Sequence, residues 1–332
     1  MINALIFGAG GFLGRNLILR CLAEKNVTLT LADIATSALE NEFIPRLEPS
    51  EIARIRAVEG DIRDEDFLAD VIRGQDVIFN CAAQASHTLS MRNPVSDAEI
   101  NCLGHLKVLE SVACLNERAV LVYPSSTTVI GKVMDAIADE THPENPLEIY
   151  SANKGIAEKY YRIYFRRHGI GSVILRFSNL YGPFGKPSPE FGFINYFIHL
   201  AAENDVIRIF GSGRQIRNVL FVEDAADLMW RAWQCPDLYG DVFLATSPYH
   251  LSVKEIAETI VSVWGTGRIE HMKWPPGRKQ IEVGDARFSA RKLKARIAWD
   301  PQNDLAAGLQ KTKFLNQRFP ASPYGSYANR SS

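Results

Sequence analysis

The sequence predicts an α/β protein built on a doubly wound parallel sheet, with a smaller C-terminal α/β domain. Three observations lead to this fold class. Short apolar runs alternate with helical stretches over the first 177 residues, the first run ends in a glycine-rich turn, and the pattern loosens beyond residue 177. The chain has 332 residues, which is enough for one large or two modest domains with a hydrophobic core.

Composition excludes several classes of protein. A formal net charge of -1 gives no electrostatic reason to expect a nucleic acid or an anionic membrane surface as partner. No apolar run approaches the roughly 18 residues that span a bilayer, and the N-terminus lacks the basic start of a signal peptide. The five cysteines have no metal-like spacing, so we expect buried thiols and no metal site. We therefore expect a cytoplasmic protein.

The first strand, turn and helix follow the order of a dinucleotide-binding fingerprint. Residues 4–7 are typical of a buried parallel strand, residues 15–24 of an amphipathic helix and residues 27–32 of a second strand. Asp33 closes the second strand, roughly twenty residues past the glycine turn. Strand, glycine turn, helix, strand and acid form the context that such a fingerprint needs.

Each part of this fingerprint has a physical role. Gly8 permits the tight turn, Gly11 lets the backbone approach a pyrophosphate, and Gly14 allows close helix packing. The helix N-terminus favours the phosphate charge. Asp33 can accept hydrogen bonds from a ribose diol and would repel a 2'-phosphate, so we expect NAD rather than NADP. The residues predicted to bind NAD here are Gly8, Gly11, Phe12, Leu13, Gly14 and Asp33.

Further strands are predicted to end at the same edge of the sheet, where ligands bind in doubly wound folds. A third strand over 55–58 is followed by Asp61 and Ile62, which we place near the adenine. A fourth run ends in Ala82 and Ala83, which are small enough to let a cofactor pass close to the backbone. The other predicted elements are helices at 64–73, 94–116, 191–203, 223–234 and 252–264 and strands at 119–123, 172–177, 207–210 and 219–222.

Tyr150 and Lys154 form a candidate catalytic pair. They lie four residues apart in a run of good helix formers, so they occupy one face of a helix. A phenol is a poor base at neutral pH, but an ammonium one turn away favours the phenolate and lowers its pKa. Such a pair could take a proton from a sugar hydroxyl or a similar alcohol. Taken alone, the spacing is more often that of an ordinary helix surface.

Motifs spread over nearly the whole chain settle the choice between these two interpretations. They are, in order, Gly8-x-x-Gly11-x-x-Gly14, Asp33, Ser125-Ser126, Tyr150-x-x-x-Lys154, Arg176-Phe177-Ser178-Asn179-Leu180-Tyr181-Gly182-Pro183 and Phe210-Gly211-x-Gly213-x-x-x-Arg217. In order and approximate spacing they resemble the extended short-chain dehydrogenases/reductases that act on nucleotide sugars. The resemblance implies a Rossmann sheet that binds NAD and a C-terminal domain that binds a nucleotide-diphosphate sugar.

The resemblance also implies a role for individual residues. Tyr150 matches the catalytic base and acid, and Lys154 matches the residue that binds the nicotinamide ribose and lowers the pKa of the tyrosine. Ser126 matches the residue that bonds the reacting sugar oxygen. Asn179 and Arg217 match positions that hold the diphosphate, which suits an uncharged amide donor and a bidentate guanidinium. Two further polar residues are interpreted as non-catalytic: Asn101 as structural and His87 as a loop histidine.

The residues after Ser126 favour one reaction. Dehydrating members of the family resemble Thr-Asp-Glu where this chain has Ser126-Thr127-Thr128, so the additional acid and base are missing from that spot. The sequence looks more like the UDP-glucose/UDP-galactose 4-epimerase type, in which the tyrosine takes a proton while hydride passes to NAD. The alternatives are a nucleotide-sugar dehydratase or keto-sugar reductase using the same site, and a catalytically silent dinucleotide-sensing or assembly protein.

The chain departs from the family pattern near its C-terminal domain. The usual Arg-Pro-Gly-Asp is here Glu282-Val283-Gly284-Asp285, which keeps Asp285 as a predicted substrate contact but replaces the arginine with an acid. Arg278 or Arg287 could take its place, and the sequence leaves this open. The nucleotide base and the sugar of the substrate are open for the same reason.

The resemblance finally implies a domain division and a homodimer. We expect residues 1–176 to bind NAD, with 214–245 returning to that domain, residues 177–319 to bind mainly the substrate, and 320–332 to form a flexible tail. Family members dimerise by packing the helices at 94–116 and around Tyr150 into a four-helix bundle. Apolar residues with the spacing for that bundle, which could equally face the sheet, are Ile100, Leu103, Leu106, Leu109 and Val112.

Overall fold

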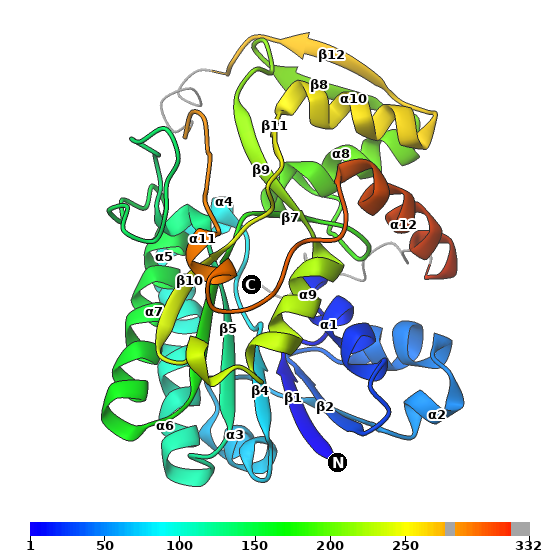
Figure 1. The fold of residues 1–332 in the computed structure, drawn as a ribbon. Helices are drawn as coiled ribbons and strands as arrows, with labels where there is room; N and C mark the ends of the chain where they lie inside the picture. Colours follow the sequence, from blue (N-terminus) through cyan, green and yellow to red (C-terminus); the bar gives the residue numbers. More distant parts are fainter. Residues whose placement is uncertain (276–282, 320–332) are drawn as a thin grey trace.

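The computed structural model describes residues 1–275 and 283–319, and it confirms the doubly wound α/β fold (Figure 1). The central sheet has seven parallel strands in the order β10-β6-β5-β4-β1-β2-β3. The order reverses between β1 and β4, and a crevice for ligands forms where the chain diverges from such a point. The strands are β1 Ile2–Phe7, β2 Val27–Asp33, β3 Ile55–Glu59, β4 Val77–Asn80, β5 Val120–Ser126, β6 Ser172–Phe177 and β10 Asp241–Ala245.

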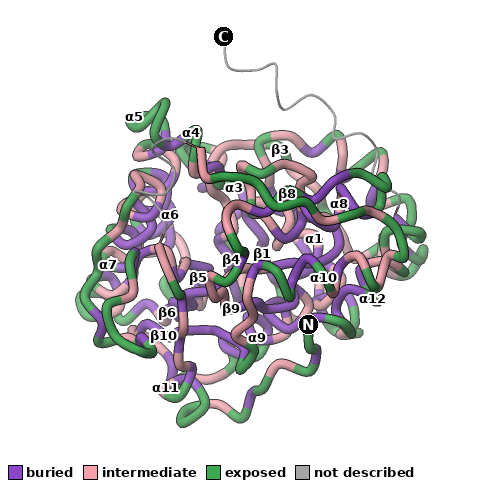
Figure 2. Tube along the Cα trace, turned by 90° about the horizontal axis from the view of Figure 1, so that it is seen from above, coloured by how far each residue is buried: buried purple, intermediate pink, exposed green. Residues whose placement is uncertain are grey.

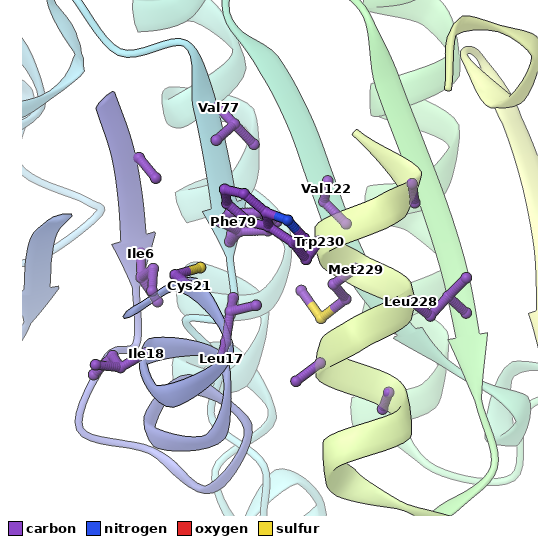
Figure 3. Packing of buried hydrophobic residues seen from close by; sticks show 14 of the residues in the cluster. Ile6, Leu17, Ile18, Cys21, Val77, Phe79, Val122, Leu228, Met229 and Trp230 are labelled. Atoms are coloured by element: carbon purple, nitrogen blue, oxygen red, sulfur yellow. The ribbon is translucent and has the colours of Figure 1, made fainter. Parts of the chain in front are cut away.

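Helices cover both faces of this sheet. One face carries α1 (Phe12–Leu22) and α9 (Val222–Ala232), and the other carries α3 (Glu65–Ile72), α6 (His105–Leu115) and α7 (Ile149–His168). Figure 3 shows side chains of α1 and α9 meeting those of β1, β4 and β5 in one cluster. Figure 2 shows the buried residues gathered along the strands, with exposed positions on the outer turns of the helices.

The apolar face of each helix explains its position. Leu17 and Cys21 of α1, Met229 and Trp230 of α9 and Phe79 of β4 are all almost fully buried in the cluster of Figure 3. Burying a leucine, methionine or phenylalanine side chain stabilises a fold by roughly 1.5–3 kcal/mol. The periodic apolar residues that predict these helices are therefore the ones that attach them to the sheet.

A second, smaller unit lies beyond the carboxyl ends of the strands. It contains a three-stranded sheet, β11-β9-β7, and a two-stranded sheet, β12-β8. Figure 1 shows it above the carboxyl ends of the strands of the main sheet. The elements of this second unit are β7 Asn179–Tyr181, α8 Phe193–Ala202, β8 Val206–Phe210, β9 Ile216–Phe221, β11 His250–Ser252, α10 Val253–Trp264, β12 Arg268–Met272 and α12 Leu305–Arg318.

Residues 320–332, the predicted tail, lie outside the described residues.

The helix predicted over 94–116 is interrupted. It divides into α5 (Pro94–Ala98), a π-helical turn (Glu99–Gly104) and α6. Such turns often occur at functional sites, and this one follows α5 beside the carboxyl end of β4. A Cβ on Gly104 would lie 2.8 Å from Cδ1 of Ile62, so the turn packs closely against the segment after β3.

The structure decides between two alternatives for some apolar residues and corrects one expectation about burial. Leu109 and Val112 pack in the chain's own core, as the alternative to a dimer contact allowed, whereas Leu103 is 50% exposed. Cys114 is exposed because it lies on the outer side of α6, and it is therefore not the buried thiol that we expected. The structure also contains α4 (His87–Arg92), β10 and α12, which were not among the predicted elements.

Candidate active site

The turn between β1 and α1 brings backbone close to the crevice. Gly8 has a φ of 72°, and a Cβ there would lie 2.8 Å from the Ala82 amide nitrogen. A Cβ on Gly14 would lie only 2.2 Å from the Gly8 carbonyl oxygen. Ala82 and Ala83 follow β4 beside this turn, and both are partly exposed. The two small-residue segments are therefore as close together as the fingerprint predicts.

The first turn of α1 provides donors at the same place. Its N-cap is Gly11, which has no side chain to bond the first N–H groups of the helix. Phe12 and Leu13 begin the helix, and their side chains pack partly against the hydrophobic clusters. An anion bound there would satisfy these donors and interact favourably with the helix dipole.

Asp33 ends β2 on the other side of the glycine turn. Its Oδ2 accepts a hydrogen bond from the Gly10 amide at 2.8 Å, and its Oδ1 accepts one from the Ala35 amide at 3.3 Å. Burial raises the pKa of Asp33, and these backbone donors oppose the rise. Glycine turn, open helix N-terminus and acid together fit a dinucleotide, with the phosphates at the turn and a ribose at the carboxylate.

The expected adenine end is more crowded. Arg63 Nη2 donates to Asp61 Oδ2 at 2.7 Å, and this hydrogen bond lowers the pKa of Asp61. Ile62 is buried, and its side chain packs against Gly104 of the π-helical turn. A cavity of about 420 Å³ adjoins it, lined by Asp61, Arg63, Asp64, Glu99, Leu103 and Lys107.

The helix that carries Tyr150 is fastened to the end of β5. Lys154 Nζ donates to the Pro124 carbonyl at 3.0 Å, and one turn further on Ser125 Oγ donates to Glu158 Oε1 at 2.5 Å. Lys154 is 3% exposed, and its ammonium lies 4.5 Å from the ring centroid of Tyr123. The face of α7 with Tyr150 and Lys154 is thus turned toward the sheet, with Lys154 buried.

Ser126 is the last residue of β5. Its Oγ accepts hydrogen bonds from the Thr128 amide at 3.2 Å and the Thr128 hydroxyl at 2.9 Å, which caps the short 3-10 turn that follows. Ser126 is partly exposed, as is Tyr150. Because α7 packs against both β5 and this turn, the structure brings Ser126, Tyr150 and Lys154 to one end of the sheet.

The charge environment of Tyr150 differs from the expected one. Burial raises the pKa of the Tyr150 phenol, and the carboxylates of Asp97 and Glu148 raise it further. Burial also lowers the pKa of Lys154 to about 8. The net shift of the Tyr150 pKa in the protein chain is therefore upward, opposite to the direction expected from Lys154 alone, because burial and two carboxylates act on the phenol.

Residues that the motifs did not identify surround Tyr150. The His87 ring meets the Tyr150 ring edge-on, with centroids 4.9 Å apart, and His87 Nδ1 contacts a carboxylate oxygen of Glu148. Asp97 is buried and accepts hydrogen bonds from Asn101 and Asn153. Asn101 bonds the protein itself, in line with the structural interpretation, whereas His87 lies directly against Tyr150. An acid two positions before the motif tyrosine was the available signal for Glu148.

A buried ion pair lies behind the catalytic face. Arg176 of β6 bonds Glu158 of α7 at 2.6 Å, and the two side chains are only 4% and 2% exposed. Arg176 also bonds Glu144 at 2.6 Å. Burial by itself lowers the pKa of Arg176, but the hydrogen bonds and charges of these two carboxylates outweigh it and raise the pKa. Because Ser125 of β5 also donates to Glu158, this carboxylate fixes the helix of Tyr150 to β5 and β6 at once.

The residues expected to hold a diphosphate bond the protein itself. Asn179 Nδ2 donates to the Asn218 carbonyl at 2.9 Å. Arg217 Nη1 donates to the Gly284 carbonyl at 2.6 Å, and Asp285 Oδ1 accepts from the Ile216 amide at 2.9 Å.

The structure thus brings Arg217 and Asp285 together beside β9. Arg287 lies in the same described segment, where its carbonyl accepts a hydrogen bond from the Ala138 amide at 2.9 Å. Arg278 and Glu282 lie outside the described residues.

Within residues 1–275 and 283–319, no helix combines the length and apolar character needed to cross a bilayer. The same residues hold no cluster of three or more His, Cys, Asp or Glu side chains that could bind a metal ion.

Comparisons with known proteins agree with this arrangement. A model of the NAD dependent epimerase/dehydratase family matches residues 4–243. A putative UDP-glucose 4-epimerase of Methanocaldococcus jannaschii is 30% identical over 310 residues, covering 92% of this chain and 96% of the relative. A dTDP-glucose 4,6-dehydratase of Streptomyces niveus is 27% identical over 324 residues, covering 94% of this chain and 91% of the relative.

The likeness extends to solved structures. A UDP-glucose 4-epimerase of Thermotoga maritima, solved with UDP-glucose, has a TM-score of 0.82 to this chain at 22% identity. The match covers 95% of this chain and 99% of that one, and it shows the fold alone. With the family model over most of the chain and a relative at 30% identity, the protein belongs to the NAD-dependent epimerase/dehydratase family of enzymes, and its cofactor is NAD.

Proposed function

We propose that this enzyme is a nucleotide-sugar 4-epimerase, which inverts a sugar hydroxyl through a keto intermediate. The observation that carries the proposal is the bond from Lys154 Nζ to the Pro124 carbonyl at 3.0 Å. It turns the Tyr150 face of α7 toward the end of β5, where Ser126 lies. A base, a cation and a hydroxyl donor then meet beside the dinucleotide cradle, which is the set that oxidation and reduction of one alcohol requires.

In this proposal each residue has one task. Tyr150 takes the proton from the sugar hydroxyl, and the Ser126 hydroxyl bonds the same oxygen. Lys154 bonds the nicotinamide ribose, and its charge offsets part of the cost that burial imposes on the phenolate. Bound NAD would supply the acceptor for a hydride from the sugar carbon and the donor of the same hydride to the other face of the keto sugar. Tyr150 then returns its proton to the oxygen, and the sugar leaves with one centre inverted.

The turn after Ser126 supports epimerisation over dehydration. Thr127 and Thr128 carry no acid, and the Thr128 hydroxyl is bonded to Ser126. Removal of water needs an additional acid and base, whereas epimerisation needs only the tyrosine. A dehydratase, or a keto-sugar reductase on the same residues, is the second candidate. It is favoured by Glu148 and His87, which place a carboxylate and an imidazole beside Tyr150 from the other side.

The substrate is proposed to be a nucleotide-diphosphate sugar held between the central seven-stranded sheet and the second, smaller unit. Asn179, Arg217 and Asp285 lie on or beside β7 and β9, and β9 joins the second unit to the crevice. A guanidinium suits a diphosphate because it can bond two oxygens at once. Arg287 lies close enough in the chain to Asp285 to supply the cation that the family pattern has at position 282.

A homodimer through α6 and α7 is part of the proposal. Leu103, Ile156 and Ile163 are apolar and 50%, 38% and 53% exposed, and they lie on the outer side of the π-helical turn and of α7. Exposed apolar side chains on adjacent helices are what an interface between two copies would bury. Ile100 and Leu106 are only partly exposed, so they would border this surface.

The test is a comparison of two tyrosines on α7. Tyr150→Phe should reduce turnover of a nucleotide sugar by several orders of magnitude and leave NAD binding unchanged. Tyr160→Phe is the matched control, since Tyr160 lies on the same helix, is partly buried and bonds Cys102 Sγ away from the site. Near-normal turnover by Tyr150→Phe would show that the proposed base is wrong.

A further inference from the structure

His87 occupies a defined position beside the proposed base. It is the first residue of α4, whose N-cap Ser86 bonds the Leu89 amide at 3.1 Å. Its ring lies edge-on to that of Tyr150, with an angle of 62° between the planes, and its Nδ1 contacts Glu148. Glu148 is in turn the N-cap residue of α7, two positions before Tyr150. The imidazole therefore bridges the carboxylate and the phenol.

A separate network fixes this position. Gln84 Nε2 donates to Asp97 Oδ2 at 2.9 Å and to the Ser86 carbonyl at 2.9 Å, which holds the start of α4. Asp97 also accepts a hydrogen bond from Asn153 of α7 at 2.8 Å. The same buried carboxylate thus holds both the segment that carries His87 and the helix that carries Tyr150. The contact between their rings is a built feature of the site and not a chance meeting of surface side chains.

The two carboxylates near Tyr150 differ in how they are compensated. Asp97 is 1% exposed and accepts hydrogen bonds from three amide side chains, those of Gln84, Asn101 and Asn153. Among the residues that the structure describes, the Glu148 carboxylate has one polar side-chain partner, His87. Both carboxylates raise the pKa of Tyr150, so compensation of the Glu148 charge depends on one imidazole.

We propose that His87 is a positioning residue that bonds Glu148 through Nδ1 and keeps its negative charge from opposing the phenolate form of Tyr150. This inference rests on the proposed role of Tyr150 as the base, and it acts through that residue, not through contact with the sugar. It holds for a neutral or a protonated imidazole, since either can present an N–H at Nδ1. The other charged or titratable groups on α4, and on α5 and the 3-10 turn Pro189–Phe191 that pack against it, are Arg92, Asp97 and Glu190. On α7, which also packs against α4, they are Lys154, Glu158, Lys159, Tyr160, Tyr161, Arg162, Tyr164, Arg166, Arg167 and His168.

The test uses substitutions with opposite expected effects. His87→Phe keeps a ring against Tyr150 but leaves Glu148 uncompensated, so the rising limb of kcat/KM against pH should move up by about one pH unit. Glu148→Gln removes the charge, so the limb should move down. His87→Asn keeps a donor near the position of Nδ1 and should restore a profile close to that of the unmodified enzyme.

A matched control exists on the same helix. His168 stacks on Tyr164 with ring centroids 5.2 Å apart, at the opposite end of α7 from Tyr150. His168→Asn should leave the pH profile unchanged. The probe is UDP-galactose with NAD-loaded protein. Where turnover is too slow, the phenolate absorbance of each variant is measured at one alkaline pH. The absorbance of the same variant carrying Tyr150→Phe is subtracted, which leaves the contribution of Tyr150, and these differences are compared.

The outcomes separate this inference from the proposed function. A purely structural role for His87 and Glu148 would shift both profiles in the same direction or lower both without a shift, and either result would overturn the inference. An unchanged limb in His87→Phe would also overturn it. If Tyr150→Phe is inactive while the profiles stay fixed, only the inference fails. If Tyr150→Phe stays active, the proposed function fails first.

Discussion

The buried ion pair between Arg176 and Glu158 allows a quantitative prediction. Replacing Arg176 with methionine keeps most of the side-chain volume and removes the charge. It leaves Glu158, which is 2% exposed, without its cation, although Ser125 still donates to it at 2.5 Å. An uncompensated buried carboxylate either remains charged in an apolar environment or takes up a proton, and both cost free energy.

The expected cost is roughly 3–5 kcal/mol of the free energy of unfolding, the range found when one partner of a buried pair is removed. Single domains are commonly stable by only about 5–15 kcal/mol, so the variant should unfold at a clearly lower urea concentration. The assay is urea unfolding followed by circular dichroism with NAD present at a fixed concentration. Turnover should also fall, because the pair fixes α7 to the strands beside Ser126.

Two controls make this prediction refutable. Arg56→Met breaks a pair with Asp70 in which both side chains are 58% exposed, so it should cost no more than about 1 kcal/mol. Arg176→Met combined with Glu158→Leu removes both charges and should be less destabilising than Arg176→Met alone. If Arg176→Met costs as little as Arg56→Met, the reasoning about burial is refuted.

Three other predictions follow from the same structure. Gly8→Ala and Gly74→Ala both place a Cβ at a φ of 72°, so each should lower the free energy of unfolding by about 1–2 kcal/mol. Of these two positions, only at Gly8 would the Cβ lie 2.8 Å from backbone atoms, so only Gly8→Ala should lose NAD affinity in calorimetry. Because the pKa of Lys154 falls from 10.5 to about 8, the unfolded chain binds more protons between these values, and the free energy of unfolding should rise with pH across them. Lys154→Met should remove about 3 kcal/mol of that rise in urea titrations, and an unchanged pH dependence would contradict the assignment. Leu103→Glu with Ile163→Glu should shift sedimentation toward the monomer, and a monomeric unmodified protein would remove the proposed interface.

Much of the fold could be predicted because the conformation of most elements is determined by residues close to one another in the sequence. The strand over 172–177 and the cap of α3 at Asp64 match the structure, since a continuous apolar run and a capping acid act within a few residues. The edge strand β10 and the short helix α4 were missed. Their residues are short runs whose conformation depends on distant partners, β6 for one and the Gln84–Asp97 network for the other.

The same distinction applies to the site. Gly8, Asp33 and the Tyr150 motif are recognisable because spacing along the chain determines where they meet. The electrostatic environment of Tyr150 could not be predicted from the sequence, because it depends on Asp97 and Glu148, which the fold brings to the phenol from separate segments. His87 was interpreted as an ordinary loop residue, but it is the first residue of α4 and it contacts Glu148, which lies 61 positions away in the sequence.

The most direct test of the central claim is to incubate the NAD-loaded protein in heavy water with a panel of UDP-, dTDP-, CDP- and GDP-sugars, without added reductant. Products are followed by mass and by proton NMR. We predict one sugar whose mass is unchanged and whose ring couplings show inversion at C4, because the hydride leaves and returns without exchanging with solvent. Loss of water, with deuterium incorporated into the sugar, would contradict the epimerase and establish the dehydratase.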